Sequence, residues 1–416
     1  MEFRKFLAAA DQGGDLHRVS ANVSCRDIPA RIQAEENGRN RAVVFENIDD
    51  YPGAVVGNAF GSTERINRSV DAANTEAFFT GIDAAIAAPK ALDLSAGGES
   101  DYVVTADPNL IDHLPPIIHS EHDSTPYITS GVVLARHPDT GRHHLCFVRL
   151  SVQDGNQVLF NPRTFRIKEI ADKTVAEGKP LEIAVLIGGP AEAALLGGLS
   201  IPDAVDELQF LQAWGGDDMK FYDRDLPVPA GTEMILFATV NPGDKPEGPF
   251  GDMRGFYITN PNPVCTVNEM WQRRDIHYPS VLGGKSHEHI GLVSLKAHHD
   301  LQHLKARTPG FIDFKLPQFG AAQLGLITVS EDVAKDTLIR ELQKISLVEM
   351  FVLLNEDTDA DNSEDVLWSL AQRANQAGDF NFHPGDPGTG ITKRTVIDAT
   401  APDLSDWRSR RVHIYK

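Results

Sequence analysis

The sequence has 416 residues, of which 41% are hydrophobic and 24% charged; this is typical of a globular protein of two or three domains and excludes extensive disorder. Its 39 Lys and Arg against 59 Asp and Glu give a net charge of −20, which argues against nucleic acid or an anionic membrane as a partner. Cys25, Cys146 and Cys265 form no CxxC pair, so neither a cysteine-rich zinc site nor a disulfide framework is expected. With no secretory signal and no run of ~20 apolar residues, the sequence predicts a cytoplasmic protein.

The N-terminal part of the chain, residues 1–105, is predicted to form a mixed α/β domain. Apolar residues with helical spacing open it, and Gly13-Gly14 provides a stop. The expected helices lie at 3–10, from residue 63 behind a Ser62 cap, and at 76–88, and the expected strands at 42–45 and 54–56.

The central part, residues 106–300, is rich in short β-like runs separated by Gly, Pro, Asn and Asp, as a sheet or barrel requires. The expected strands lie within 127–134, 144–153, 182–187, 234–240 and 255–259, with one small-residue helix at 190–196.

The C-terminal part, residues 301–416, alternates strands and helices, which favours a parallel α/β layer. The expected order is a strand at 325–329, a helix capped by Ser330, a strand at 349–354, and a helix capped by Asn362 or Ser363.

Two acids and one arginine are the first candidates for chemistry. Glu247 and Asp252 bracket a glycine-rich turn, EGPFGD, and paired acids in a small site push their pKa values apart, which suits general acid/base work. Arg149 lies in an otherwise apolar run and requires a carboxylate partner or an anionic ligand if it is buried. The alternatives are an acidic surface turn and an arginine at the solvated edge of the sheet.

Glycines and histidines give weaker signals. Gly188-Gly189 and Gly197-Gly198 flank a short helix and either approach a phosphate through backbone N–H groups or serve tight packing. The stretch 287–303 contains five histidines, and His299 and His303 are spaced to share a helix face and a metal. HExxH is absent, however, so a solvated polar segment is the favoured interpretation.

Several segments, in order along the chain, resemble the UbiD-like decarboxylases, which use prenylated FMN. They are RAVVFENI (41–48), VVGNAFGSTERI (55–66), the segment from LPPIIH to GRHH (114–144), IGGPAEAALLGGLSIPDAVDE (187–207), VPAGTEMIL (228–236), EGPFGDMRGFY (247–257), DVLWSLAQR (365–373) and TKRTVIDAT (392–400). The resemblance implies an α+β multidomain fold, in which a central split β-barrel that binds the flavin is flanked by N- and C-terminal α/β domains.

The resemblance also implies the site residues. The family's catalytic trio falls on Arg149, Glu247 and Asp252, the three residues already singled out on physical grounds. The residues implied to bind prenylated FMN are His144, Leu145, Phe147, Arg149, Gly197, Gly198, Leu199 and Glu207.

A divalent metal, Mn or Mg, is implied at His144 and Glu207, bridging to the cofactor phosphate, and a monovalent cation, K or Na, is implied beside it. The family's further ligand, a histidine on a following strand, has no counterpart in LFNPRTFRI (159–167). Asn161 or Arg163 is expected to approach the phosphate instead.

The implied activity is the non-oxidative, reversible decarboxylation of an α,β-unsaturated or (hetero)aromatic carboxylic acid. Arg149 would orient the carboxylate, Asp252 would protonate the carbon, and Glu247 would pair with Arg149. Phe250, Ile290 and the 281–290 loop are candidate substrate contacts. The implied partners are a flavin prenyltransferase, as cofactor supplier, and a second copy of the chain, through the C-terminal domain.

Two other classes of protein remain open. A non-catalytic flavin-binding or assembly subunit of a decarboxylase complex would explain the altered metal position. A His-dependent metallo-hydrolase would use the 287–303 cluster instead of Arg149.

Overall fold

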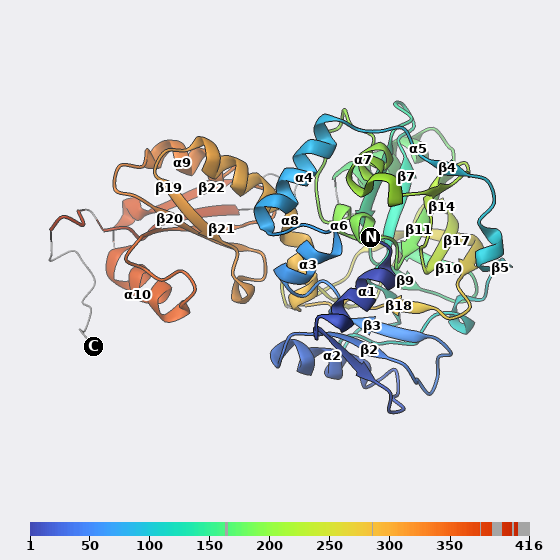
Figure 1. Cartoon of the computed structure of the whole chain (residues 1–416). Coiled ribbons are helices and arrows are strands. Elements are labelled where there is room, and N and C mark those ends of the chain that lie inside the picture. The colour runs from blue at the N-terminus through green and yellow to red at the C-terminus, as the bar shows by residue number, and fades with distance from the viewer. Residues whose placement is uncertain (163–164, 285, 375, 385–392, 402, 407–416) are drawn as a thin grey trace. The chain divides into compact units, whose positions relative to one another are not determined.

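The computed structural model describes residues 1–162, 165–284, 286–374, 376–384, 393–401 and 403–406 (Figure 1). The chain forms two compact units, Met1–Leu292 and Val293–Lys416, where the sequence predicted three domains. The predicted boundary at residue 300 falls inside helix α8 (His287–Arg307).

The N-terminal sheet shows why the first 105 residues do not stand apart from the central region. Its four strands, in the order β1-β2-β3-β18, are β1 (Leu16–Val19), β2 (Ala42–Phe45), β3 (Ala54–Gly57) and β18 (His277–Pro279). Strand β18 comes from far along the chain and pairs in parallel with β3. Helix α2 (Ile28–Asn37) covers this sheet with Ile28 and Ile32.

The central sheet is an antiparallel half-barrel of nine strands, as the β-like runs predicted (Figure 1). Its strands are β5 (Val103–Ala106), β6 (Tyr127–Ile128), β7 (Val132–Arg136), β8 (His143–Phe147), β9 (Leu150–Val152), β10 (Gln157–Phe160), β11 (Leu181–Ile187), β14 (Met234–Pro246) and β17 (Pro261–Gln272). The predicted runs 127–134 and 144–153 are each divided into two strands, and the breaks face each other where Val148 N–H donates to Gly131 O at 3.2 Å.

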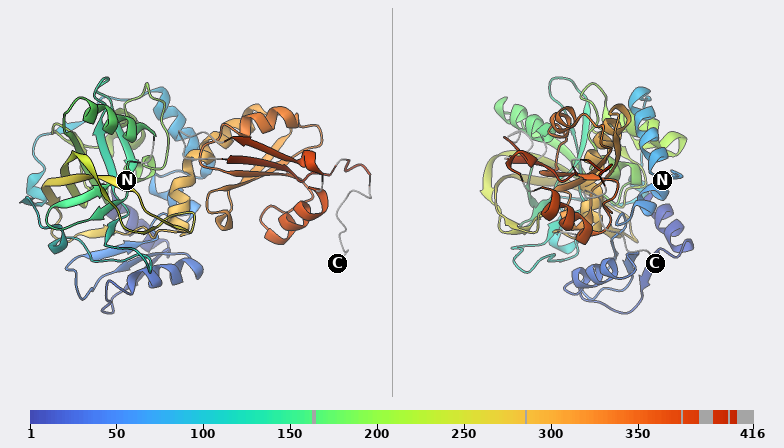
Figure 2. Two further views of the ribbon diagram at one scale, coloured as in Figure 1. Left: turned by 180° about the vertical axis from the view of Figure 1, so that it is seen from behind. Right: turned by 90° about the vertical axis from the view of Figure 1, so that its left-hand side faces the viewer.

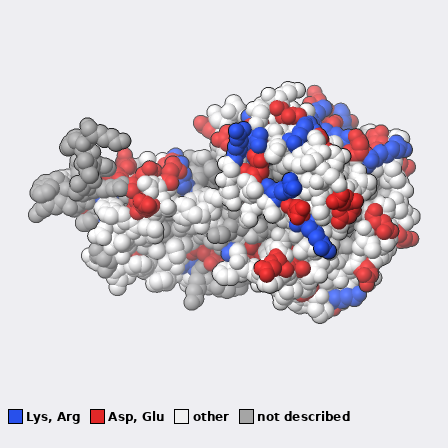
Figure 3. Space-filling model, turned by 90° about the horizontal axis from the view of Figure 1, so that it is seen from below, with Lys and Arg blue, Asp and Glu red and all other residues white. Residues whose placement is uncertain are grey.

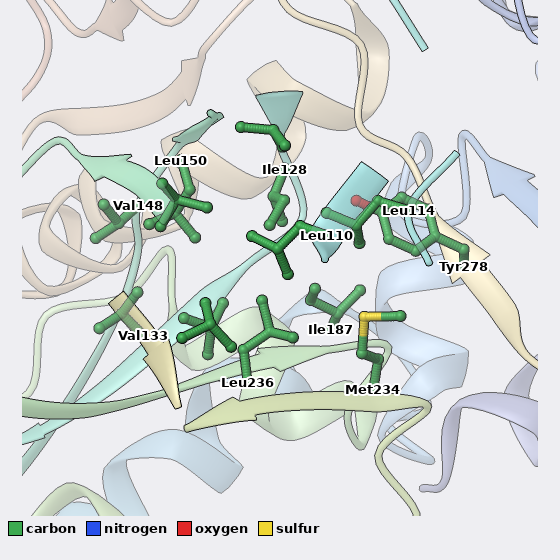
Figure 4. Close-up of a cluster of buried hydrophobic side chains, with 14 of the residues drawn as sticks. Leu110, Leu114, Ile128, Val133, Val148, Leu150, Ile187, Met234, Leu236 and Tyr278 are labelled. Carbon is green, nitrogen blue, oxygen red and sulfur yellow. The ribbon is translucent and has the colours of Figure 1, made fainter. Parts of the chain in front are cut away.

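The core of this unit fills the concave side of the half-barrel. Figure 4 shows Val133, Val148, Ile187 and Leu236 from or beside its strands, meeting side chains such as Tyr278 from β18. The alternation of apolar residues along each strand therefore produces one continuous core shared with the N-terminal sheet.

Helices and short strands complete the first unit. The helices are α1 (Phe3–Gln12), α3 (Thr63–Ser69), α4 (Thr75–Ala87), α5 (Phe165–Ala176), α6 (Ala191–Leu196) and α7 (Glu207–Gly215); the short strands are β4 (Leu94–Ser95), β12 (Phe221–Tyr222), β13 (Val228–Pro229), β15 (Phe250–Gly251) and β16 (Tyr257–Ile258). Ser62 caps α3 as predicted, because its hydroxyl accepts from Arg65 N–H at 3.2 Å. Asp206 caps α7 through Leu208 N–H and Gln209 N–H.

The second unit is a three-layer α/β structure (Figure 2). Its elements are β19 (Phe311–Lys315), β20 (Leu324–Val329), α9 (Lys335–Leu342), β21 (Met350–Asn355), α10 (Ser363–Arg373), β22 (Phe380–Pro384) and β23 (Lys393–Asp398). Buried residues of α8 and α9 pack on one face of the sheet, and those of α10 pack on the other. Asn362 caps α10, as one of the two predicted caps. Ser330 does not cap α9, which begins five residues later, because the Ser330 hydroxyl bonds Asp332 and Gly310 O.

Charged side chains of both signs are interspersed on the face of the molecule seen in Figure 3. Among the described residues, no helix combines the length and the apolar character needed to cross a membrane.

Candidate active site

An arginine and a glutamate form the centre of the candidate site. Arg149 lies between β8 and β9, not within a continuous strand, and Glu247 directly follows β14. The guanidinium forms a fork on the carboxylate, with Nη2–Oε2 at 2.7 Å and Nε–Oε1 at 3.1 Å. The Glu247 side chain is fully buried and that of Arg149 is 13% exposed. The partner that a buried Arg149 requires is therefore Glu247, and the acidic surface turn is excluded.

The turn that carries the two acids is clamped by the segment before β6. Asp123 accepts from Gly251 N–H at 2.9 Å, and Ser124 N–H donates to Pro249 O at 3.2 Å. Burial raises the pKa of Asp123, against the opposing effect of its backbone N–H partners and of Arg149. A Cβ atom at Gly248 would lie 2.0 Å from the Ser124 hydroxyl, so the turn requires glycine there.

Asp252 lies at the far end of the same turn. Within the described part of the chain no hydrogen bond joins its carboxylate to Arg149 or Glu247, and its charge acts on His289 of α8. Burial lowers the pKa of His289, and the Asp252 charge opposes that shift. A neutral imidazole therefore accompanies the acid, and the Phe250 ring lies 4.7 Å from the Arg149 guanidinium on the other side of the turn.

A second cluster of charges surrounds Glu207 at the N-terminus of α7. His144 Nδ1 lies 3.0 Å from both carboxylate oxygens, and Leu145 N–H donates to Oε2 at 2.5 Å. Arg166, on α5, donates from Nη1 to Oε1 at 2.5 Å. Three of the residues expected to hold the cofactor, His144, Leu145 and Glu207, are thus brought together.

The carboxylate of Glu207 favours the charged form of the His144 imidazole. Burial alone would lower the pKa of His144, but the Glu207 carboxylate and the Cys146 side chain outweigh this effect and raise it to about 10. Its Nε2 atom is buried and has no hydrogen-bond partner among the described residues. A buried donor without a partner is costly, so this atom is prepared for an acceptor on a ligand.

The same cluster does not fit a divalent metal in the arrangement described. His144 and Glu207 offer two ligands, whereas the third neighbour, Arg166, is a permanent cation without a lone pair to donate. The guanidinium is also held by Ile201 O at 2.6 Å and by Asp203.

The glycine-rich turn approaches the other end of β8. A Cβ atom at Gly197 would lie 2.9 Å from the Phe147 ring, and one at Gly198 would lie 2.1 Å from Leu292 O. Phe147 N–H donates to Gly197 O at 3.3 Å. Both glycines therefore permit a close approach of backbone, while the following Leu199 is half-buried.

A small cavity lies beside this turn. Its lining includes Phe147, Gly188, Gly189, Ala194 and the buried carboxylate of Glu288. Gly188 and Gly189 thus border this cavity, whereas Gly197 lies against the Phe147 ring that also lines it.

Some candidate residues lie elsewhere. Asn161 is buried at the end of β10, and Arg163 lies outside the described residues. The 287–303 stretch is the helix α8 and not the solvated segment predicted; His299 and His303 contact each other through Nε2 atoms 3.1 Å apart, and burial lowers the pKa of His298 to about 4. The apolar residues of α8, spaced three and four apart, were the missed helix signal.

Three functional neighbours were missed from the sequence. Asp123 lies within a segment that resembles the family, Arg166 lies on the polar side of an amphipathic helix, and His289 was grouped with the histidine stretch. Only Asp123 carried a local signal, a short acidic residue in a turn-rich segment.

Residues 95–286 match the 3-octaprenyl-4-hydroxybenzoate carboxy-lyase Rift-related domain (UbiD), and residues 7–84 match the N-terminal domain of the same enzymes. The two matches cover more than half of the chain. The chain therefore belongs to the UbiD-like decarboxylase family.

Solved structures agree with this assignment. The UbiD-class enzyme HmfF from Pelotomaculum thermopropionicum, in complex with FMN, is 26% identical with a TM-score of 0.86, over 99% of this chain and 97% of that one. Vanillic acid decarboxylase from Sedimentibacter hydroxybenzoicus is 24% identical with a TM-score of 0.82, over 100% and 95% of the two chains. The 3,4-dihydroxybenzoic acid decarboxylase of Klebsiella pneumoniae is 20% identical with a TM-score of 0.84, over 100% and 97%. The last two similarities show the shared fold.

Proposed function

We propose that this protein catalyses the non-oxidative decarboxylation of an α,β-unsaturated or aromatic carboxylic acid with prenylated FMN as its cofactor. The observation that carries the proposal is the buried fork of Arg149 on Glu247 at a turn that ends in Asp252. The relative HmfF is described with FMN and, in an evolved dimeric form, with prenylated FMN.

The residues around β8 fit such a cofactor. The unpartnered Nε2 of His144 can donate to a phosphate oxygen, and Gly197 and Gly198 leave room that a side chain would fill. The cavity beside Phe147 is a candidate place for part of the flavin ring. When bound, prenylated FMN supplies an electron sink for the carbon centre that loses CO2.

The chain's own residues orient the acid and control the proton. Arg149 keeps N–H donors for a substrate carboxylate while Glu247 fixes the plane of its guanidinium. Asp252 donates a proton to the carbon from which CO2 has departed, and its charge acts on the buried imidazole of His289. Asp123 holds the turn that places Asp252.

The test is CO2 release from a panel of unsaturated and aromatic acids by protein co-expressed with a flavin prenyltransferase, with the bound cofactor identified by mass spectrometry. Asp252→Asn should lower turnover by about 10²- to 10⁴-fold, with flavin retained. Asp244→Asn, in the exposed part of β14, is the matched control. Near-normal turnover of Asp252→Asn would refute the proton-donor role.

The alternative, a non-catalytic flavin-binding subunit, draws support from Arg166 at the predicted metal position. It predicts flavin binding without CO2 release from any acid. We further propose a homodimer through the C-terminal unit, to be tested by light scattering; one relative is described in an evolved dimeric form.

A further inference from the structure

The carboxylate of Glu207 is buried, and its side chain is only 2% exposed; among the described residues, the potential metal ligand at hydrogen-bond distance from it is His144. We propose that the Arg166 guanidinium takes the place of a divalent cation at Glu207, so that this chain binds the flavin phosphate without a metal. The inference rests on the proposed flavin binding and concerns how that binding is achieved.

Both carboxylate oxygens of Glu207 are fully engaged. Oε1 accepts from Arg166 Nη1 at 2.5 Å and lies 3.0 Å from His144 Nδ1, while Oε2 accepts from Leu145 N–H at 2.5 Å and lies 3.0 Å from the same imidazole nitrogen. A metal ion would have to displace donors from these oxygens. Only coordination of the metal itself would then compensate for the charge-assisted hydrogen bonds that are lost.

Arg166 is fixed in this position by more than Glu207. Its Nη2 donates to Ile201 O at 2.6 Å and to Asp203, and its side chain is 20% exposed. A guanidinium stays protonated at every pH of interest and cannot ligate a cation. The remaining ligand set of one imidazole and one carboxylate falls short of the four to six ligands that Zn, Mg and Mn take.

A permanent cation faces the buried carboxylate of Glu207, because the Arg166 guanidinium donates to Oε1 at 2.5 Å. Asp203 also contacts Arg166, but it is 86% exposed and screened by solvent. The Asp206 carboxylate caps the N-terminus of α7 and contacts His143, whose Nδ1 lies 2.9 Å away.

Two buried atoms point to where the anion binds. The Nε2 atoms of His143 and His144 have no hydrogen-bond partner among the described residues, and His144 is only 8% exposed. Glu207 holds the Nδ1 side of His144, so Nε2 is the ring nitrogen left to face a ligand. A phosphate group would give this nitrogen a hydrogen-bond partner, whereas a metal at Glu207 would compete for the same imidazole.

The experiment measures the dissociation constants of FMN and of riboflavin, which lacks the phosphate, by quenching of flavin fluorescence in EDTA and in Mn²⁺. Metal content is measured in parallel by mass spectrometry after dialysis against Mn²⁺. The wild type should bind FMN at least tenfold more tightly than riboflavin, equally in EDTA and in Mn²⁺, and should retain far less than one Mn²⁺ per chain.

Variants of Arg166 test the residue itself. Arg166→Gln should weaken FMN by about 10- to 100-fold and leave riboflavin unchanged. Arg166→His, which adds a third ligand, should regain FMN affinity only with Mn²⁺. Lys168→Gln removes one cation from an exposed position on the same helix and should change neither constant.

The outcomes separate the inference from the function. FMN binding that requires Mn²⁺, or one Mn²⁺ retained per wild-type chain, would overturn the role of Arg166 and leave the proposed cofactor intact. Equal binding of FMN and riboflavin would overturn the phosphate contact and leave flavin binding intact, whereas binding of neither flavin would overturn both the inference and the proposed function. The wild-type comparison needs no variant, so misfolding of a substituted chain leaves it decisive.

Discussion

The buried fork between Arg149 and Glu247 makes a quantitative prediction for stability that does not depend on knowing the substrate. Arg149→Leu strands a carboxylate whose side chain is fully buried, whereas Glu247→Leu strands a guanidinium that is 13% exposed and lies 4.7 Å from the Phe250 ring. Removing one partner of a buried pair costs about 3–5 kcal/mol. We therefore expect about 4–5 kcal/mol for Arg149→Leu and about 2–4 kcal/mol for Glu247→Leu.

The double variant Arg149→Leu/Glu247→Leu carries no stranded charge. Replacing a whole buried ion pair by apolar side chains is often neutral, so we expect a loss of about 0–2 kcal/mol, well below the sum of the single variants. The difference between the loss in the double variant and the summed losses of the two single variants is the interaction free energy of Arg149 with Glu247.

Calorimetry of the unfolding transition of Met1–Leu292 measures the cycle, with about 2 °C in Tm for each kcal/mol in a unit of this size. The control cycle is Lys168→Ala with Asp172→Ala, an exposed pair on α5 whose coupling should not exceed about 0.5 kcal/mol. Additive losses at Arg149 and Glu247 would refute the reasoning, because they would mean that neither charge depends on the other.

Three further predictions concern the acid-bearing turn, the glycine-rich turn and the buried acids near α8. Asp123→Ala should lower kcat by about tenfold or more with little change in KM, since it releases the turn without touching substrate; an unchanged kcat in steady-state kinetics would contradict the clamp. Gly198→Ala should abolish flavin binding or soluble expression, because its Cβ would lie 2.1 Å from Leu292 O; normal FMN affinity by fluorescence would contradict this. Burial raises the pKa values of Glu36 and Glu288 to about 7 from an ordinary 4.5, so the folded state holds their protons more tightly than the unfolded state. Their contribution to stability is complete below pH 4.5 and is lost as the pH rises through 7, and Glu288→Gln should flatten the decline of Tm over that range.

Local patterns were sufficient for much of the fold. The helical spacing of Phe3, Phe6, Leu7 and Ala10 predicted α1, and all four residues are buried. Short β-branched runs predicted the half-barrel strands, since alternation along a strand is a local property. Where the prediction failed, as at Ser330, a competing side-chain hydrogen bond within the turn delayed the helix.

The residues of the candidate site that share a sequence motif were predicted. Those that are joined only by tertiary contacts were missed. Glu247 and Asp252 lie in one glycine-rich turn, so the sequence shows them together. Arg166 reaches Glu207 across 41 residues, and Asp123 reaches Gly251 across 128. No periodicity or propensity states which polar side chain of an amphipathic helix will meet a given helix end, so these partners had to come from the structure.

The break after β8 explains how one segment can serve two kinds of chemistry. In a continuous strand, residues five apart point to opposite faces, so His144 and Arg149 would be separated by the sheet. Strand β8 ends at Phe147 and β9 begins at Leu150, which frees Arg149 from that alternation and lets it turn to Glu247. Five residues at ~3.3 Å each place the two residues no more than about 16 Å apart. One short piece of chain thereby sets the distance between a cationic cluster suited to a phosphate and an acid pair suited to proton control.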